Sequence, residues 1–115
     1  MSHHESPVRF RHMLDHAREA VAMASGKTRA DLDADRKPNL ALVRVLEIVG
    51  EAANRIPPEE RLQHSQMPWS QIVLLRHRLI HGYDVVDFDV LWQIVCHDLS
   101  PLVALLEQIV AHERG

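Results

Sequence analysis

Arg76 and His81 are five positions apart, and their side chains have the chemistry needed to act on a phosphodiester. A guanidinium holds two phosphate oxygens at once and keeps its charge, while an imidazole, with an unperturbed pKa of about 6.5, exchanges protons near neutrality. Cleaving RNA without a metal requires a base for the 2′-hydroxyl proton, an acid for the leaving oxygen, and positive charge beside the phosphate. Arg76 and His81 are candidates for two of these roles.

The segment that carries these residues is predicted to be a helix from about Trp69 to His81, since Pro68 suits a first helical turn and Gly82 suits a helix end. Arg76 falls in the middle of the apolar stripe of this helix, which consists of Trp69, Ile72, Val73, Leu79 and Ile80. A buried guanidinium is costly unless it meets a carboxylate, a phosphate or a water-filled pocket. We therefore expect Arg76 either to pair with an acidic residue of a neighbouring helix or to bind phosphate.

Glu47 and Glu51 are the candidate partners of Arg76, one turn apart on a long preceding helix. The other interpretation is a solvated acidic face, because glutamates are mostly exposed. Gly50 and Ala53 lie on the same helix and are small enough to let another helix approach closely. The sequence thus predicts that this helix packs beside the segment that carries Arg76.

The string Arg76-His77-Arg78-Leu79-Ile80-His81-Gly82-Tyr83 resembles the R-x4-H-x-Y signature of HEPN domains, and in particular of their HepT-like toxin subfamily. Further strings in the same order extend the resemblance over most of the chain, at residues 34–37, 46–53, 68–69 and 92–99. His77 departs from the asparagine that HepT relatives mostly carry, although the family pattern asks only for a polar residue there.

The resemblance implies a metal-independent endoribonuclease that acts as the toxin of a HEPN/MNT (type VII) toxin–antitoxin pair, with Arg76 and His81 as catalytic residues. On an ideal helix these two residues would be separated by about 140° and about 7.5 Å of rise, so one chain builds half a site. A homodimer would place two arginines and two histidines around one groove, as the resemblance implies. His77 and Arg78 are predicted to support this site or to contact RNA.

Tyr83 occupies the position at which HepT-like proteins are modified with AMP by a partner nucleotidyltransferase of the MNT type, the antitoxin. That partner would use ATP and magnesium, whereas this chain is predicted to need no cofactor. AMP would add bulk and negative charge beside Arg76 and His81, which would exclude RNA. Without the motif, Tyr83 would be interpreted as an anchor of a helix end. A second function stays open, that of a non-catalytic nucleotide- or substrate-binding subunit that docks on a nucleotidyltransferase.

A metal site is the rival interpretation of the same histidines, because His77 and His81 are four residues apart on the predicted helix. A third ligand would have to come from Asp84, Asp87 or His97, and no H-E-x-x-H or cysteine pattern supports such a set. We therefore predict no metal site.

The predicted fold is all-α, a single antiparallel bundle of four to five helices formed by one domain that spans residues 1–115. Periodic apolar residues and their flanking caps and breakers place helices at about 6–25, 29–34, 35–57, 69–81 and 87–111. Gly26 is predicted to end the first of these helices, and Asp87 is predicted to cap the last. Pro101 should kink or break the last helix. Residues 1–6 and 112–115 are predicted to be flexible.

The composition excludes several classes of protein. A net charge of −3 argues against binding nucleic acid over a broad surface, so any contact with RNA must be local. The single cysteine, Cys96, and the lack of an apolar N-terminal run favour the cytoplasm. No window approaches the roughly 18 consecutive apolar residues of a membrane span, so no membrane association is predicted.

Overall fold

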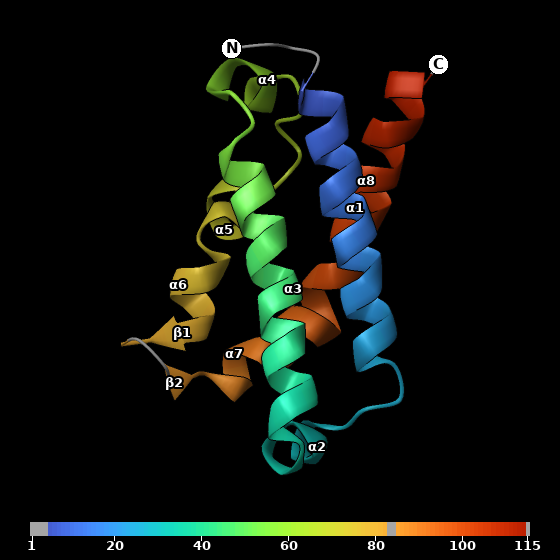
Figure 1. The fold of residues 1–115 in the computed structure, drawn as a ribbon. Helices are drawn as coiled ribbons and strands as arrows, with labels where there is room; N and C mark the ends of the chain where they lie inside the picture. The colour runs from blue at the N-terminus through green and yellow to red at the C-terminus, as the bar shows by residue number, and fades with distance from the viewer. Residues whose placement is uncertain (1–4, 83–84, 115) are drawn as a thin grey trace.

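The computed structural model describes residues 5–82 and 85–114, which form an antiparallel helical bundle with one small hairpin. Its helices are α1 (Glu5–Ala24), α2 (Arg29–Ala34), α3 (Arg36–Asn54), α4 (Pro58–Leu62), α5 (Trp69–Val73), α6 (Leu75–Leu79), α7 (Phe88–Gln93) and α8 (Leu99–Arg114), and the hairpin pairs β1 (Ile80–His81) with β2 (Val85–Val86). Figure 1 shows α3 with α1 on one side and α5 and α6 on the other. The predicted all-α class is confirmed.

The core forms where the apolar stripes of the long helices meet, as the periodicity predicts. Helix α1 packs against both α3 and α8, and its small residues Ala17 and Ala20 are fully buried between them. From α3 and α8 the core receives Leu42, Leu46, Val49, Leu99, Leu102, Leu106 and Ile109. These helices therefore form a rigid frame against which the shorter helices α5 and α6 are held.

The predicted helix from Trp69 to His81 is wrong in two places. It is interrupted at Leu74, which separates α5 from α6, and it ends at Leu79. Ile80 adopts an extended conformation and begins the hairpin, where β-branched residues pair across a turn that contains Gly82 at a φ of 65°. Because of the interruption, the apolar stripe is not continuous and Arg76 does not lie on a buried seam.

The last helical run contains the irregularity predicted near Pro101, in the form of a π-helical segment at Ile94–Asp98 between α7 and α8. The N–H of Leu99 donates to the carbonyl of Ile94, five residues back. Pro101 has no N–H to donate, and its ring crowds the carbonyl of His97 in a regular helix, so the wider π turn accommodates it. Figure 1 shows the run changing direction between α7 and α8.

Within the described residues, one helix, Phe88–His112, is long and apolar enough to cross a membrane by length and composition alone. This is weak evidence for a span, because the core helix of a soluble protein passes the same test, and Leu99, Leu102 and Leu106 of this helix are buried in the bundle. The helices also reach into the terminal segments predicted to be flexible, since α1 begins at Glu5 and α8 extends to Arg114.

Candidate active site

Arg76 projects from α6 toward α3 and forms an ion pair with Glu47. Its Nε lies 3.2 Å from Oε2 of Glu47. The arginine side chain is 57% exposed, whereas the glutamate side chain is only 15% exposed. Within the described residues, Arg76 makes its side-chain polar contact through Nε, so its two terminal nitrogens remain available for an anion.

The close packing of α3 against α5 and α6 sets the position of this pair. Gly50 lies one turn after Glu47, and a Cβ atom there would be 2.9 Å from the carbonyl oxygen of Ile72 and 3.5 Å from Cβ of Leu75. The prediction that Gly50 permits a close approach is confirmed. A shallow hollow of about 300 Å³ lies along this contact and is lined by Glu47, Gly50, Glu51, Asn54, Val73, Leu74, Arg76 and His77.

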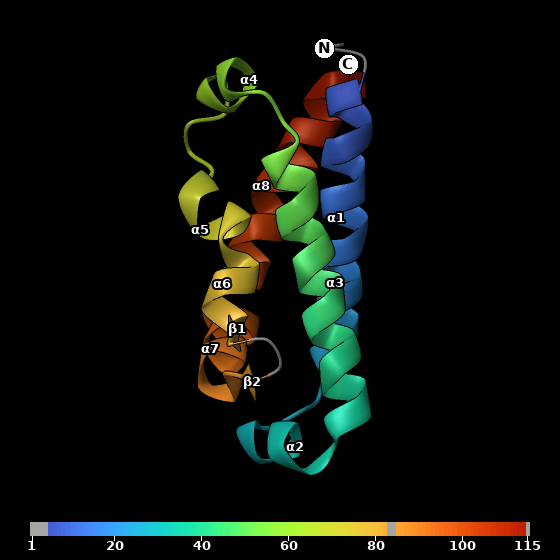
Figure 2. The ribbon, with the colours of Figure 1, turned by 60° about the vertical axis from the view of Figure 1, so that its left-hand side comes forward.

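His81 lies on β1, where it pairs across the hairpin with Val85. Its Nε2 is 3.2 Å from Oδ2 of Asp87, and its side chain is 59% exposed. The backbone N–H of Asp87 donates to the carbonyl of Leu79, which ties the end of the hairpin to the end of α6. Figure 2 shows the hairpin directly beyond α6 and next to α7.

Asp87 therefore has two roles. Its Oδ1 accepts from the N–H of Val90, which caps α7 as the sequence predicts, and its Oδ2 contacts His81. The hydrogen bond from Val90, and then the one with His81, hold the pKa of the Asp87 carboxyl below its usual value. The carboxylate is thus charged at neutral pH and orients the imidazole.

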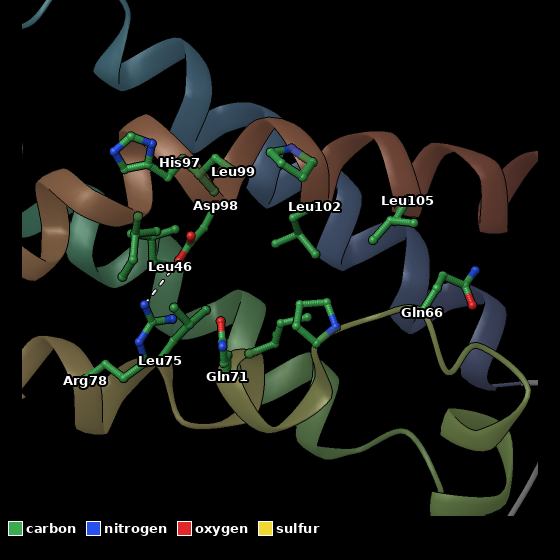
Figure 3. Close-up of a pocket in the computed structure, with 14 residues that line it drawn as sticks. Leu46, Gln66, Gln71, Leu75, Arg78, His97, Asp98, Leu99, Leu102 and Leu105 are labelled. Atoms are coloured by element: carbon green, nitrogen blue, oxygen red, sulfur yellow. Dashed lines mark hydrogen bonds and ion pairs between the residues drawn. The ribbon is translucent and has the colours of Figure 1, made fainter.

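The other predicted site residues are distributed around α6. His77 is exposed and lines the hollow beside Arg76, while Arg78 points to the other side of the helix and contacts Asp98, with 3.1 Å between Nη2 and Oδ2 (Figure 3). Glu51 pairs with Arg44 at 3.1 Å rather than with Arg76. Tyr83 and Asp84 lie outside the described residues.

The spacing argument for a metal site is wrong, because His81 lies on β1 and not one turn after His77 on a helix. In the described part of the chain, no group of three or more histidine, cysteine, aspartate or glutamate residues comes together as a metal site would require. Two of the candidates for a third ligand lie among the described residues. Asp87 caps α7, and His97 lines a separate cavity.

Comparison with known proteins places this arrangement in a family. A family model described as HepT-like, "Ribonuclease HepT-like", matches residues 13–109, which include both the bundle and the R-x4-H-x-Y string. The chain belongs to the HepT-like ribonuclease family.

Several relatives of this HepT-like protein cover most of its length, and two of them illustrate the similarity. A Thermococcus cleftensis protein named "Probable ribonuclease HepT" is 35% identical over 100 residues, which are 84% of this chain and 91% of the relative. A Caldanaerobacter subterraneus subsp. tengcongensis protein named "Putative RNase TTE0752" is 31% identical over 103 residues, which are 90% of this chain and 92% of the relative. No solved structure matches the chain.

The structure of this HepT-like protein adds one candidate residue that the sequence did not identify as part of the site. Asp87 was predicted as a helix cap and considered as a metal ligand, and its contact with His81 depends on the hairpin that brings the two together. The sequence carried little signal for this contact, because Ile80 is the one β-branched residue just before Gly82 and the segment also suits a helix.

Proposed function

We propose that this protein is a metal-independent endoribonuclease whose catalytic residues are Arg76 and His81. Two observations carry the proposal. Both side chains are more than half exposed, Arg76 on α6 and His81 on the strand that directly follows it. Each is also paired with a carboxylate, Glu47 for Arg76 and Asp87 for His81. The family match and the printed names of the relatives support the same activity.

In the proposed reaction, the 2′-hydroxyl of RNA attacks the adjacent phosphorus and the bond from phosphorus to the 5′-oxygen of the next nucleotide breaks, which leaves a 2′,3′-cyclic phosphate and a 5′-hydroxyl that takes its proton from the acid. With Nε2 of His81 donating to Asp87, Nδ1 carries a lone pair that accepts the hydroxyl proton, and the charge of Asp87 stabilises the imidazolium that results. The exposed nitrogens of Arg76 hold the phosphate oxygens as their charge grows in the transition state. The side chains thus provide the base and the positive charge.

The proposed active unit is a homodimer, because one chain provides one imidazole that a carboxylate orients, His81, whereas the reaction needs both a base and an acid. Two large apolar side chains are exposed beside the site, Leu74 at 46% near Arg76 and Val85 at 60% opposite His81. Large exposed apolar side chains at both ends of α6 provide apolar surface for a contact with a second copy of the chain. A twofold axis at this face would give one groove with two guanidiniums and two imidazoles.

As the toxin of a toxin–antitoxin pair, the ribonuclease would be silenced when its partner nucleotidyltransferase transfers AMP from ATP to Tyr83 with the help of magnesium. Tyr83 follows His81 by two residues, between the two strands of the hairpin. A phosphodiester there adds negative charge beside the site and repels RNA. The predicted cytoplasmic location is consistent with this role and stays a prediction.

The activity is tested with protein expressed without its partner and incubated with RNA in the presence of a chelator. We expect cleavage by the parent and losses of about 100-fold or more in Arg76→Ala and His81→Ala. Arg18→Ala is the matched control, because Arg18 is also about half exposed and ion-paired, with Glu107 at 2.7 Å, but lies on α1. Mixing Arg76→Ala with His81→Ala should restore part of the activity if the groove is shared between two chains.

Three results would contradict the proposal in different ways. An inactive parent that binds a nucleotidyltransferase tightly would favour the alternative, a non-catalytic nucleotide- or substrate-binding subunit. An active parent whose intact mass does not change with ATP, magnesium and the partner enzyme would retain the ribonuclease and exclude modification of Tyr83. A Tyr83→Phe variant that still gains the mass of AMP would move the modification to another residue.

A further inference from the structure

A second cavity of about 300 Å³ lies on the other side of α6 from Arg76, between α5 and α6 on one wall and the π-helical segment and α8 on the other. Its surface is mainly apolar, and Leu46 of α3 forms the floor (Figure 3). The apolar walls come from Leu75, Leu102 and Leu105 together with two prolines. Concave, mostly apolar pockets with a few convergent polar groups are the usual form of a small-molecule site.

The ion pair of this cavity lies at one end, and Gln66 lies at the other (Figure 3). Arg78 from α6 and Asp98 from the π-helical segment reach toward one another from opposite walls, and their contact spans the cavity at 3.1 Å (Figure 3). The contact joins one nitrogen to one oxygen, and the side chains are 30% and 40% exposed. Within the described residues neither group makes another side-chain contact, so several N–H donors of Arg78 and an acceptor oxygen of Asp98 remain available.

The π-helical segment is what presents Asp98 to this cavity. It interrupts the i to i−4 bonding of the last helical run at Ile94–Asp98, and Ile94, His97 and Asp98 all line the cavity. Short π-helical turns within α-helices are frequent at functional sites. The π-helical turn thus lies in the wall of the cavity and supplies one member of the ion pair that crosses it.

We propose that this cavity is a subsite for one nucleoside of the RNA substrate, in which the base lies between the apolar walls and its hydrogen-bonding edge meets Arg78 and Asp98. The inference rests on the proposed ribonuclease activity for its substrate. A base in such a site is held by its apolar faces and by a donor and an acceptor at its edge. The exposed amides of Gln66 and Gln71, also in the lining, are placed for the ribose hydroxyls.

The charge at the polar end selects this class of ligand over others. A carboxylate or a phosphate would compete with Asp98 for Arg78 and leave an unpaired negative charge. A cation would compete with Arg78 for Asp98 and leave an unpaired positive charge. An aliphatic chain would fill the space between the apolar walls, but it would remove water from Arg78 and Asp98 without replacing the lost hydrogen bonds. A neutral heterocycle with a donor beside an acceptor, as on the edge of a nucleobase, satisfies both groups without breaking their charge balance.

The placement also relates the subsite to the proposed catalytic residues. Arg76 and Arg78 are two residues apart on α6, so they point in directions about 200° apart around the helix axis. Arg76 faces the hollow shared with Glu47, and Arg78 faces the cavity. A strand that passes over α6 would present a phosphate to one side of the helix and a base to the other.

The test is a titration of the ¹⁵N-labelled full chain with each of the four ribonucleosides, which contain no phosphodiester and so report binding without cleavage. We expect saturable shifts of backbone amides at the cavity walls with at least one nucleoside. Asp98→Asn should weaken binding about tenfold, since it removes a charged hydrogen-bond acceptor. Gln71→Trp, which places a ring at an exposed lining position, should abolish it. Asp89→Asn is the matched control, because Asp89 pairs with Arg29 at 2.7 Å outside the cavity.

No saturable shifts with any nucleoside, or shifts confined to the hollow of Arg76, would overturn the proposal. Equal binding of hexanol would do the same, because it would show an apolar cavity without base recognition. Nucleoside binding by a protein that cleaves no RNA would support the subsite and refute the ribonuclease. If RNA is cleaved, Asp98→Asn should change which base is preferred at the cleavage site, and an unchanged preference would overturn the role of Arg78 and Asp98.

Discussion

Replacing Gly50 with alanine tests the packing that positions Arg76. A Cβ atom at this position would lie 2.9 Å from the backbone oxygen of Ile72. Carbon–oxygen contacts in proteins are usually about 3.3–3.6 Å, so α5 must move away from α3 by about 0.4–0.7 Å. A backbone oxygen cannot turn aside as a flexible side chain would. The substitution therefore separates the two elements that bring Arg76 and Glu47 together.

The expected magnitude combines two opposing effects. Alanine favours the interior of a helix over glycine by about 1 kcal/mol, which alone would stabilise the fold. Overpacking a tight contact costs about 1–3 kcal/mol. The free energy of unfolding of Gly50→Ala should therefore be lower than that of the parent by up to about 2 kcal/mol, measured by urea denaturation with an unchanged m-value.

The reverse substitution at an open position provides the reference. Ala104 is exposed in the middle of α8, so Ala104→Gly reports the helix preference without a packing change, and it should cost about 1 kcal/mol. If Gly50→Ala instead stabilised the protein by as much as Ala104→Gly destabilises it, α5 and α6 would not approach α3 as closely as described, and the account of how Arg76 is held would be refuted.

Three further predictions concern the surroundings of the site. Asp87→Ala should lower the free energy of unfolding by about 1 kcal/mol at pH 7 through loss of the α7 cap. The pKa of Asp87 is lower in the folded protein than in the unfolded chain. The stability that the carboxylate adds is therefore present above the ordinary carboxyl pKa and is lost as the pH falls through the folded value. Urea denaturation at pH 3 should show a smaller difference in unfolding free energy between the parent and Asp87→Ala than at pH 7. Glu47→Gln should lower the cleavage rate at saturating RNA, since it loosens the orientation of Arg76. It should not weaken RNA affinity, because it also removes a negative charge beside the site, and a drop in affinity would contradict this prediction. Leu74→Glu should weaken the dimer at least tenfold in sedimentation experiments, whereas Leu62→Glu, at a residue 78% exposed on α4, should not.

The long helices could be predicted from the sequence because their signals are local. Apolar residues recur at helical spacing in α1 and α3, and Gly26 at a φ of 78° follows the end of α1 as predicted. The cap at Asp87 and the irregularity before Pro101 likewise follow from single residues whose backbone requirements are strict. Each of these features depends on neighbours within about two turns of the chain.

The interruption at Leu74 and the hairpin could not be predicted in the same way, because both depend on contacts across the fold. The segment 75–81 has residues that tolerate a helix, and Gly82 suits a helix end as well as a hairpin turn. What decides between them is the pairing of Ile80 with Val86 and the packing against α3. The pairing of Arg76 with Glu47 and not with Glu51 also depends on contacts across the fold. The two glutamates are one turn apart on α3, and the position of α6 along α3 decides which of them meets Arg76.

The ion pair between Arg76 and Glu47 is compatible with binding RNA because of how the two groups are exposed. The glutamate side chain is 15% exposed, whereas the arginine side chain is 57% exposed, so an approaching phosphate meets the cation before its counterion. The pair uses Nε and leaves the terminal nitrogens for bidentate contact with phosphate. A protein with a net charge of −3 can in this way present a local positive site, in which the acidic partner fixes the direction of the arginine instead of neutralising its outer face.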